Sequence, residues 1–310
     1  MLVLFRMLIF CLFLSFLHFA CSGSKQITCN PNRMATFCNP PNGIKINEKL
    51  FCDQTEISNI GWLEYMVWTK RVFGKKSLEY KSTLPNESIW RDKDLEHYSI
   101  KDWNLTNFRF AEFPIVGITQ EQAMNYSIWR TDRVFEMFLN VNLIIKSPKE
   151  TTKENYFTVE KYFSGKMNIE PDTAYLYYPE FRLPNLYERT LILHYSDSVD
   201  NAYQLTNDCK KCWLDYYKTS KDSNSKRIIK LEEPVRQELK VPCIAPNGLH
   251  HIRGNVREWV IEPRIAVGEC RINLAEKETI KNQDIFFTNQ VNAWTGFRNV
   301  CEWKKFEKKN

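Results

Sequence analysis

The cysteines are the residues of this chain whose type and spacing could support chemistry. Cys209 and Cys212 form a Cys-x-x-Cys pair with two lysines between them. Such a pair can act as a redox dithiol, because neighbouring lysines lower a thiol pKa. It can also form half of a zinc site, with further ligands drawn from Cys243, His250 and His251, although their spacing is not a standard pattern. The interpretation we favour is that both thiols belong to structural disulfides.

The whole cysteine set points the same way. Of ten cysteines, Cys11 lies in an apolar leader and Cys21 directly follows it, which leaves eight. An even set in an exported chain predicts structural disulfides, whose connectivity the sequence does not fix. The expected disulfide cysteines are Cys29, Cys38, Cys52, Cys209, Cys212, Cys243, Cys270 and Cys301.

The N-terminal residues predict export. Arg6 is followed by an almost entirely apolar stretch to Ala20, which is short for a bilayer span, so residues 1–20 are expected to be a signal peptide. Two cleavage points are open. Cleavage before Cys21 would make this residue the acylated N-terminus of a lipoprotein, whereas an ordinary signal peptidase would cut after Ser22. We take Cys21 as the lipidation site. The Pro-, Asn- and Gly-rich residues 21–45 are expected to form a tether.

Composition indicates a folded body. Hydrophobic residues make up 43% and aromatic residues 14% of the 310 residues, which is too apolar for a disordered chain. The net charge of +6 is spread along the sequence, apart from a basic tail at residues 304–310. Because no basic stripe is interleaved with aromatic residues, nucleic acid is not an expected partner.

The hydrophobic spacing predicts two helices. One is capped by Thr55 or Ser58 and runs through residues 62–68, after a strand that begins at Leu50. The other begins at Thr119, which forms a capping box with Gln122. Its expected buried stripe comprises Ala123, Tyr126, Trp129 or Arg130, Val134 and Met137.

The remaining segments give weaker signals. Strands or strand-flanking segments are expected at residues 176–178 and 191–195. Long loops are expected over residues 72–110, an insertion over 150–175 and a surface excursion over 197–240.

Five motifs follow one another along the chain. They are Glu56-Ile-Ser-Asn59, Pro114-Ile-Val-Gly-Ile-Thr119 with Trp129-Arg130, Arg182-Leu-Pro-Asn-Leu-Tyr-Glu188, Gly254-Asn-Val-Arg-Glu-Trp259 and Gly296-Phe-Arg298. In this order they resemble the formylglycine-generating-enzyme (sulfatase-modifying-factor) domain family, over residues 46–303. The resemblance implies an α+β fold, irregular and C-type-lectin-like, with little regular secondary structure. The run Trp129-Arg-Thr-Asp-Arg-Val134 is most similar to gliding-motility and type IX secretion lipoproteins of Bacteroidetes within that family.

The resemblance also says what catalysis would require. Catalytic members hold Cu(I) between two cysteines about five residues apart, and soft thiolates suit that ion. The corresponding region here, residues 264–275, offers Cys270 alone. Cys270 and Cys301 are therefore the catalytic candidates that remain, and we expect the chain not to be an enzyme.

Calcium is the cofactor that the resemblance offers, with oxygen ligands from Asn255 and Glu258. The alternative is that Asn255 holds a turn and Glu258 pairs with an internal arginine, such as Arg298 or Arg182.

These features predict a non-catalytic cell-envelope lipoprotein that uses its domain as an interaction scaffold, in gliding motility or type IX secretion. Its expected partners are a membrane, through lipid on Cys21, and proteins of an envelope complex. Its expected place is the outer membrane, periplasm or cell surface. The alternatives are a copper-dependent formylglycine-generating oxidase acting on protein cysteine and a calcium-dependent glycan-binding module.

Overall fold

The structure of the protein is a computed structural model. It describes residues 39–91, 105–167, 169–172, 175–202, 248–252, 254–268, 285–288 and 290–307. All of these belong to one compact unit, Asn39–Asn310. The expected signal peptide, Cys21 and the first part of the expected tether lie outside the described residues.

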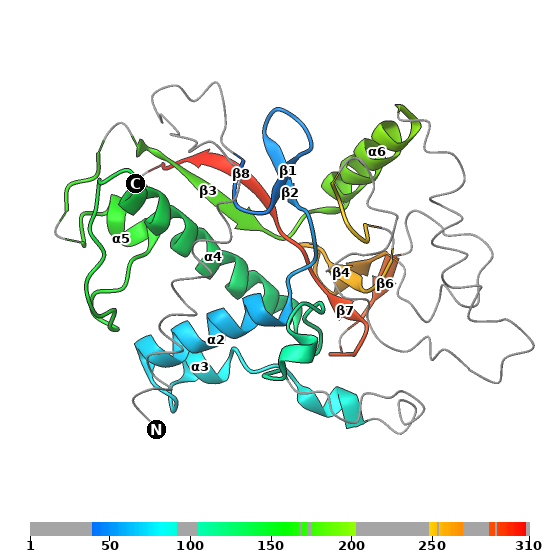
Figure 1. The fold of residues 1–310 in the computed structure, drawn as a ribbon, viewed down its shortest axis with the longest axis horizontal. Helices are drawn as coiled ribbons and strands as arrows, with labels where there is room; N and C mark the ends of the chain where they lie inside the picture. Colours follow the sequence, from blue (N-terminus) through cyan, green and yellow to red (C-terminus); the bar gives the residue numbers. More distant parts are fainter. Residues whose placement is uncertain are drawn as a thin grey trace, which may run out of the picture. The chain divides into compact units, whose positions relative to one another are not determined.

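The first sheet joins the two ends of this unit (Figure 1). Its strand order is β1-β2-β8-β3, and all neighbours are antiparallel. The strands are β1 (Gly43–Lys45), β2 (Leu50–Asp53), β8 (Val300–Lys305) and β3 (Tyr177–Arg182). The strand predicted at Leu50 is therefore confirmed. The last three residues of the expected tether form β1, and the first two of the expected basic tail end β8.

The second sheet has the order β6-β5-β4-β7. Its strands are β6 (Ile285–Phe287), β5 (Ile265–Val267), β4 (Arg257–Trp259) and β7 (Thr295–Gly296). β4 and β7 are parallel, whereas the other neighbours are antiparallel. This sheet carries the last two sequence motifs on adjacent strands.

Both predicted helices are confirmed. α2 (Asn59–Phe73) is capped by Ser58, whose Oγ accepts from the Gly61 backbone N–H at 3.2 Å. α4 (Gln120–Val141) has the capping box, with Thr119 Oγ1 and Gln122 Oε1 accepting at 3.1 and 2.8 Å.

The predicted buried stripe of α4 agrees only in part with the structure. Ala123 and Tyr126 are buried, but Met137 is 50% exposed. The stripe continues through Thr131, Phe135 and Leu139 instead, because α4 packs on β3, where Thr131 Oγ1 accepts from the Phe181 backbone N–H at 2.8 Å.

The expected strand at residues 191–195 is wrong, because this segment lies within helix α6 (Leu186–Ala202). Asn185 and Glu188 cap the start of this helix, and Ile192, Leu193 and Ser196 are buried at helical spacing. The strand expected at residues 176–178 is confirmed by β3. The expected loops and insertion contain short helices: α3 (Leu78–Lys81), η2 (Glu87–Arg91), η4 (Phe108–Phe110) and α5 (Val159–Phe163).

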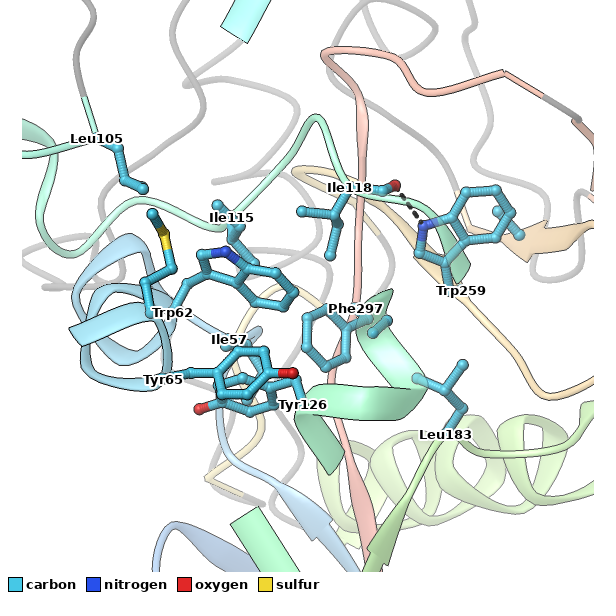
Figure 2. Close-up of a cluster of buried hydrophobic side chains, with 13 residues drawn as sticks. Ile57, Trp62, Tyr65, Leu105, Ile115, Ile118, Tyr126, Leu183, Trp259 and Phe297 are labelled. Carbon is cyan, nitrogen blue, oxygen red and sulfur yellow. Dashed lines mark hydrogen bonds between the residues drawn. The ribbon is translucent and has the colours of Figure 1, made fainter. Parts of the chain in front are cut away.

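The main core joins α2, α4 and the last motifs (Figure 2). The Trp62 ring stacks on Tyr126 with centroids 5.5 Å apart, and it meets Phe297 edge-on at 6.1 Å. Trp259 donates its Nε1 to the carbonyl of Ile118 at 3.3 Å. Aromatic packing of this kind fixes the motif segments against each other. None of the helices in the described ranges is long and apolar enough to cross a membrane.

Candidate functional site

Arg298 lies at the centre of a buried ion-pair network. The Gly-Phe-Arg motif leads from β7 into β8, and the Arg298 side chain is fully buried. Its Nε donates to Oε1 of Glu258 at 2.7 Å. Its Nη1 and Nη2 donate to the backbone carbonyls of Asp53 and His250, at 3.1 and 2.8 Å. One side chain therefore joins β4, the end of β2 and residues 248–252.

Two carboxylates and two guanidinium groups balance the charge of this network. Nη2 of Arg298 lies 3.9 Å from Oε2 of Glu56, and Nη1 of Arg189 lies 3.6 Å from Oε2 of Glu258. Helix α6 supplies Arg189, which also donates to the backbone carbonyl of Ile252. All four charged side chains are buried. Since an unpaired buried charge costs several kcal/mol, each of these charged groups can remain buried only beside an oppositely charged partner.

Burial changes the protonation of two members of the site. It raises the pKa of Glu56 to about 7, while Arg298 acts to lower that pKa and Glu258 to raise it. Burial, together with the charges of Arg298 and His250, lowers the pKa of His251 to about 3. His251 is therefore neutral at pH 7, and Glu56 is the carboxyl group of the network that titrates near neutrality.

Asn255 and Glu258 do not fit a calcium ion. Asn255 uses its Nδ2 to donate to Oε1 of Glu56 at 3.1 Å, and its φ of 72° places it in the left-handed region. Glu258 directs one oxygen to Arg298 and the other towards Arg189. Two guanidinium groups beside one carboxylate repel a divalent cation. Across the residues that the structure describes, no group of three or more His, Cys, Asp or Glu side chains could hold a metal ion. The predicted alternative, a pair between Glu258 and Arg298, is confirmed.

The Trp-Arg motif makes a second ion pair. Nη1 and Nη2 of Arg130, on α4, bind the two carboxylate oxygens of Asp53 at 2.6 and 2.9 Å. The Asp53 carboxylate also accepts from the Asn299 backbone N–H at 3.0 Å, and the guanidinium group lies 4.1 Å from the Phe181 ring centroid. This two-point contact fastens α4 to β2, β3 and the start of β8.

The Arg-Leu-Pro motif makes a third. Arg182 binds both carboxylate oxygens of Glu188 at 2.7 and 2.6 Å, and its Nη2 also contacts Glu302 at 3.1 Å. Glu188 Oε2 and Asn185 Oδ1 each accept from the other residue's backbone N–H, at 2.9 and 2.7 Å. This reciprocal cap starts α6 at Leu186. The hydrogen bonds to Glu188 raise the pKa of Arg182, so that side chain stays charged.

Cys52 and Cys301 are free thiols, and both are buried. This corrects the expectation that they belong to disulfides. In the β2–β8 register Cys52 faces Val300, whereas Cys301 faces Phe51. Successive side chains alternate between the faces of a sheet, so the two sulfurs lie on opposite faces and cannot bond. The other six expected disulfide cysteines lie outside the described residues: Cys29, Cys38, Cys209, Cys212, Cys243 and Cys270.

Cys301 also does not fit a copper-binding thiolate. Its side chain is only 2% exposed, and burial raises its pKa. Burial likewise raises the pKa of Cys52, to about 12. A neutral thiol is a poor metal ligand and nucleophile. Cys270, the other catalytic candidate, lies beyond the described part of the chain, so the pair is not brought together here.

Sequence reasoning missed two members of these networks, Asp53 and Arg189, and considered His251 only as a possible zinc ligand. Asp53 is the last residue of β2, and Arg189 follows the third motif by one residue. Nothing local marks any of them as a partner, because each contacts a segment distant in the chain. Burial of a charge is the signal that finds them, and it needs coordinates.

The two short-stranded sheets, flanking helices and motif-borne ion pairs define an α+β protein of the formylglycine-generating-enzyme-like fold. The family model described as "Sulfatase-modifying factor enzyme 1-like domain" matches residues 20–302. The chain therefore belongs to the sulfatase-modifying-factor domain family, as its motifs predicted. No curated protein and no solved structure matches the chain.

Proposed function

We propose that this member of the family is a non-catalytic, lipid-anchored envelope protein whose domain serves as a rigid interaction scaffold. The observation that carries the proposal is the burial of Cys301, which is one of the two cysteines still available for catalysis. A peptide substrate cannot reach a sulfur that is 2% exposed within a strand paired on both sides. Cys270 alone would leave a copper ion without its second thiolate.

The use made of the motif residues supports a scaffold. Arg130, Arg182 and Arg298 each bind a carboxylate within the fold, and each joins segments distant in sequence. A surface held in fixed geometry by such contacts can bind a partner with little loss of conformational entropy on binding. In the proposed scaffold, the arginines of the family motifs therefore stabilise the fold and take no part in a reaction.

The proposed anchor is Cys21. Cleavage of the peptide bond between Ala20 and Cys21 would leave an acylated N-terminal cysteine at the outer membrane, periplasm or cell surface. The proposed partners are proteins of a gliding-motility or type IX secretion complex. The motivation is the leader, the Cys-Ser-Gly-Ser run that follows it and the Trp129-Arg-Thr-Asp-Arg-Val134 segment.

The absence of catalysis is tested with the purified mature chain, a copper(I) source, oxygen and a peptide containing one cysteine. Mass spectrometry follows conversion of the peptide cysteine to formylglycine. We expect no conversion by the wild type, by Cys270→Ser or by Cys301→Ser. Conversion by the wild type that disappears in Cys270→Ser would overturn the proposal.

The anchor and the partners are tested in the host. The mass of the N-terminal peptide should include acyl chains, and Cys21→Ser should move the chain from the membrane to the soluble fraction. Crosslinking of the wild-type chain in intact cells should capture envelope proteins, and independent preparations should yield the same ones. A wild-type chain that begins after Ser22 would rule out the lipid anchor while leaving export intact.

A further inference from the structure

Five cations gather where α2 meets α3. Lys70 and Arg71 form the last turn of α2, Lys75 and Lys76 follow in the connecting turn, and Lys81 ends α3. All five side chains are exposed. We call these five residues the basic patch. They do not form a continuous run in the sequence, and the turn between the helices is what groups them.

The packing of α2 and α3 holds the basic patch together (Figure 1). Nζ of Lys70 lies 6.0 Å from the centroid of the Tyr80 ring, so the end of α2 meets α3. Glu79 of α3 lies 3.9 Å from Nζ of Lys153, so these two opposite charges pair with each other and add no net charge to the region. Among the described residues, no carboxylate lies within ion-pair distance of the basic patch. Its charge is therefore not neutralised by that part of the fold.

Exposed aliphatic side chains accompany these cations. Val67 is 53% exposed and precedes Lys70 and Arg71 by three and four residues. Leu78 is 80% exposed and precedes Lys81 by three. Residues three or four apart share one face of a helix. Both helices therefore present an aliphatic side chain and a cation on the same face, which is the combination found on surfaces that lie on anionic membranes.

We propose that the basic patch, with Val67 and Leu78, docks the folded domain on an anionic phospholipid surface. The proposal deepens the lipid anchor at Cys21 and rests on it, since a lipid chain and a basic surface together hold a protein on a membrane more firmly than either does alone. Four of the five cations are lysines. Their flexible point charges suit a fluid layer of headgroups, whereas arginine is more usual opposite the fixed carboxylates of a folded partner.

The test uses the full-length mature chain with Cys21→Ser, so that acylation plays no part. Flotation measures its binding to vesicles of phosphatidylcholine alone and to vesicles that also contain phosphatidylglycerol. We expect binding to the anionic vesicles, lost as salt is raised, and little binding to the neutral ones. Adding Lys75→Glu and Lys76→Glu should weaken that binding at least roughly 30-fold, because two attractive charges are lost and two repulsive ones are added. Leu78→Ser should weaken it less.

The matched control reverses the same number of charges elsewhere. Lys49 and Lys305 are exposed and belong to the first sheet and its connecting turn. Lys49→Glu with Lys305→Glu should keep the binding, and thermal unfolding shows whether each variant is folded. Equal binding to both vesicle types, no binding to anionic vesicles, or equal loss in the control would overturn the proposal. Binding to polyglutamate without binding to vesicles would do the same and would indicate an acidic protein partner. The acyl mass at Cys21 is read separately, so failure of the anchor is distinguishable from failure of the docking.

Discussion

Glu258, on β4, and Arg298, in the segment between β7 and β8, meet in the core, with 2.7 Å between Oε1 and Nε. Their side chains are 1% exposed each. Among the described residues, neither belongs to a group of side chains that could hold a metal ion. In the described part of the chain, the last Glu and the last Arg of the family motifs therefore pair with each other within the fold.

Removing Arg298 should destabilise the protein strongly. Arg298→Met leaves Glu56 and Glu258 with Arg189 as the nearby cation, so Glu56 must take up a proton or stay in the core as an uncompensated carboxylate. We expect a loss of about 3–5 kcal/mol in the free energy of unfolding, measured by urea denaturation. The conservative Arg298→Lys should lose less, because it keeps the charge. A loss below about 1 kcal/mol for Arg298→Met would show that the network contributes little.

Local signals were sufficient for the helix starts. Ser58 and the pair Thr119–Gln122 satisfy backbone N–H groups within three residues, so their effect is contained in the sequence around them. The same type of cap at Asn185 and Glu188 could also have been predicted from the sequence, because the two residues have the capping-box spacing. The apolar run from Leu191 to Tyr195 concealed it, because a short apolar segment suits a strand and a buried helix equally.

The networks could not be predicted in the same way. Asp53 pairs with Arg130, which lies 77 residues away in the sequence. Arg298 donates to the backbone carbonyl of Asp53, from which it is 245 residues distant. Such pairs depend on which strands become neighbours, and β8 lies between β2 and β3 although it comes last in the chain. The thiols illustrate the same limit. Their even number predicts disulfides, but the register that separates Cys52 from Cys301 exists only in the folded sheet.

His251 should make the protein less stable in acid. Its pKa is about 3 in the folded state and near 6.5 in the unfolded chain. The stability that it contributes is present above pH 6.5 and is lost as the pH falls towards 3. His251→Asn should remove this dependence, and asparagine tolerates the φ of 54° at this position. Between pH 7 and pH 4, the free energy of unfolding should therefore fall less steeply with falling pH in the variant than in the wild type. An unchanged slope would contradict the lowered pKa of His251.

Glu56 should act in the opposite direction. Its pKa is raised to about 7 from an unfolded value of 4.5, so the folded state holds its proton more tightly. The stability from this group is fully present below pH 4.5 and is lost as the pH rises through 7. The stability of the wild type relative to Glu56→Gln should accordingly fall across that range. A relative stability that rises with pH would mean that Arg298 outweighs the burial of the carboxyl group.

Gly296 should not tolerate a side chain. A Cβ at this position would lie 2.6 Å from the carbonyl oxygen of Ile115 and 3.2 Å from Cγ2 of Val256. Gly296→Ala must therefore move the backbone, and we expect a loss of about 1–3 kcal/mol in thermal or urea unfolding. Gly61→Ala is the matched control. An added Cβ at this position would lie 3.3 Å from its nearest neighbour, the Tyr126 hydroxyl oxygen, and alanine favours the helix. Equal losses in both variants would contradict the steric explanation.

Cys52 and Cys301 should resist alkylation until the protein unfolds. Both thiols are buried, and burial raises both pKa values, so the reactive thiolate is scarce as well as inaccessible. Iodoacetamide should leave their peptides unmodified in buffer and label both in denaturant without any reductant. Mass spectrometry of the two peptides measures this directly. Labelling of Cys301 in buffer would mean that its strand opens, and a need for reductant would mean that it is held in a disulfide. Either result would return Cys301 to the set of residues that can react, and with it the oxidase alternative.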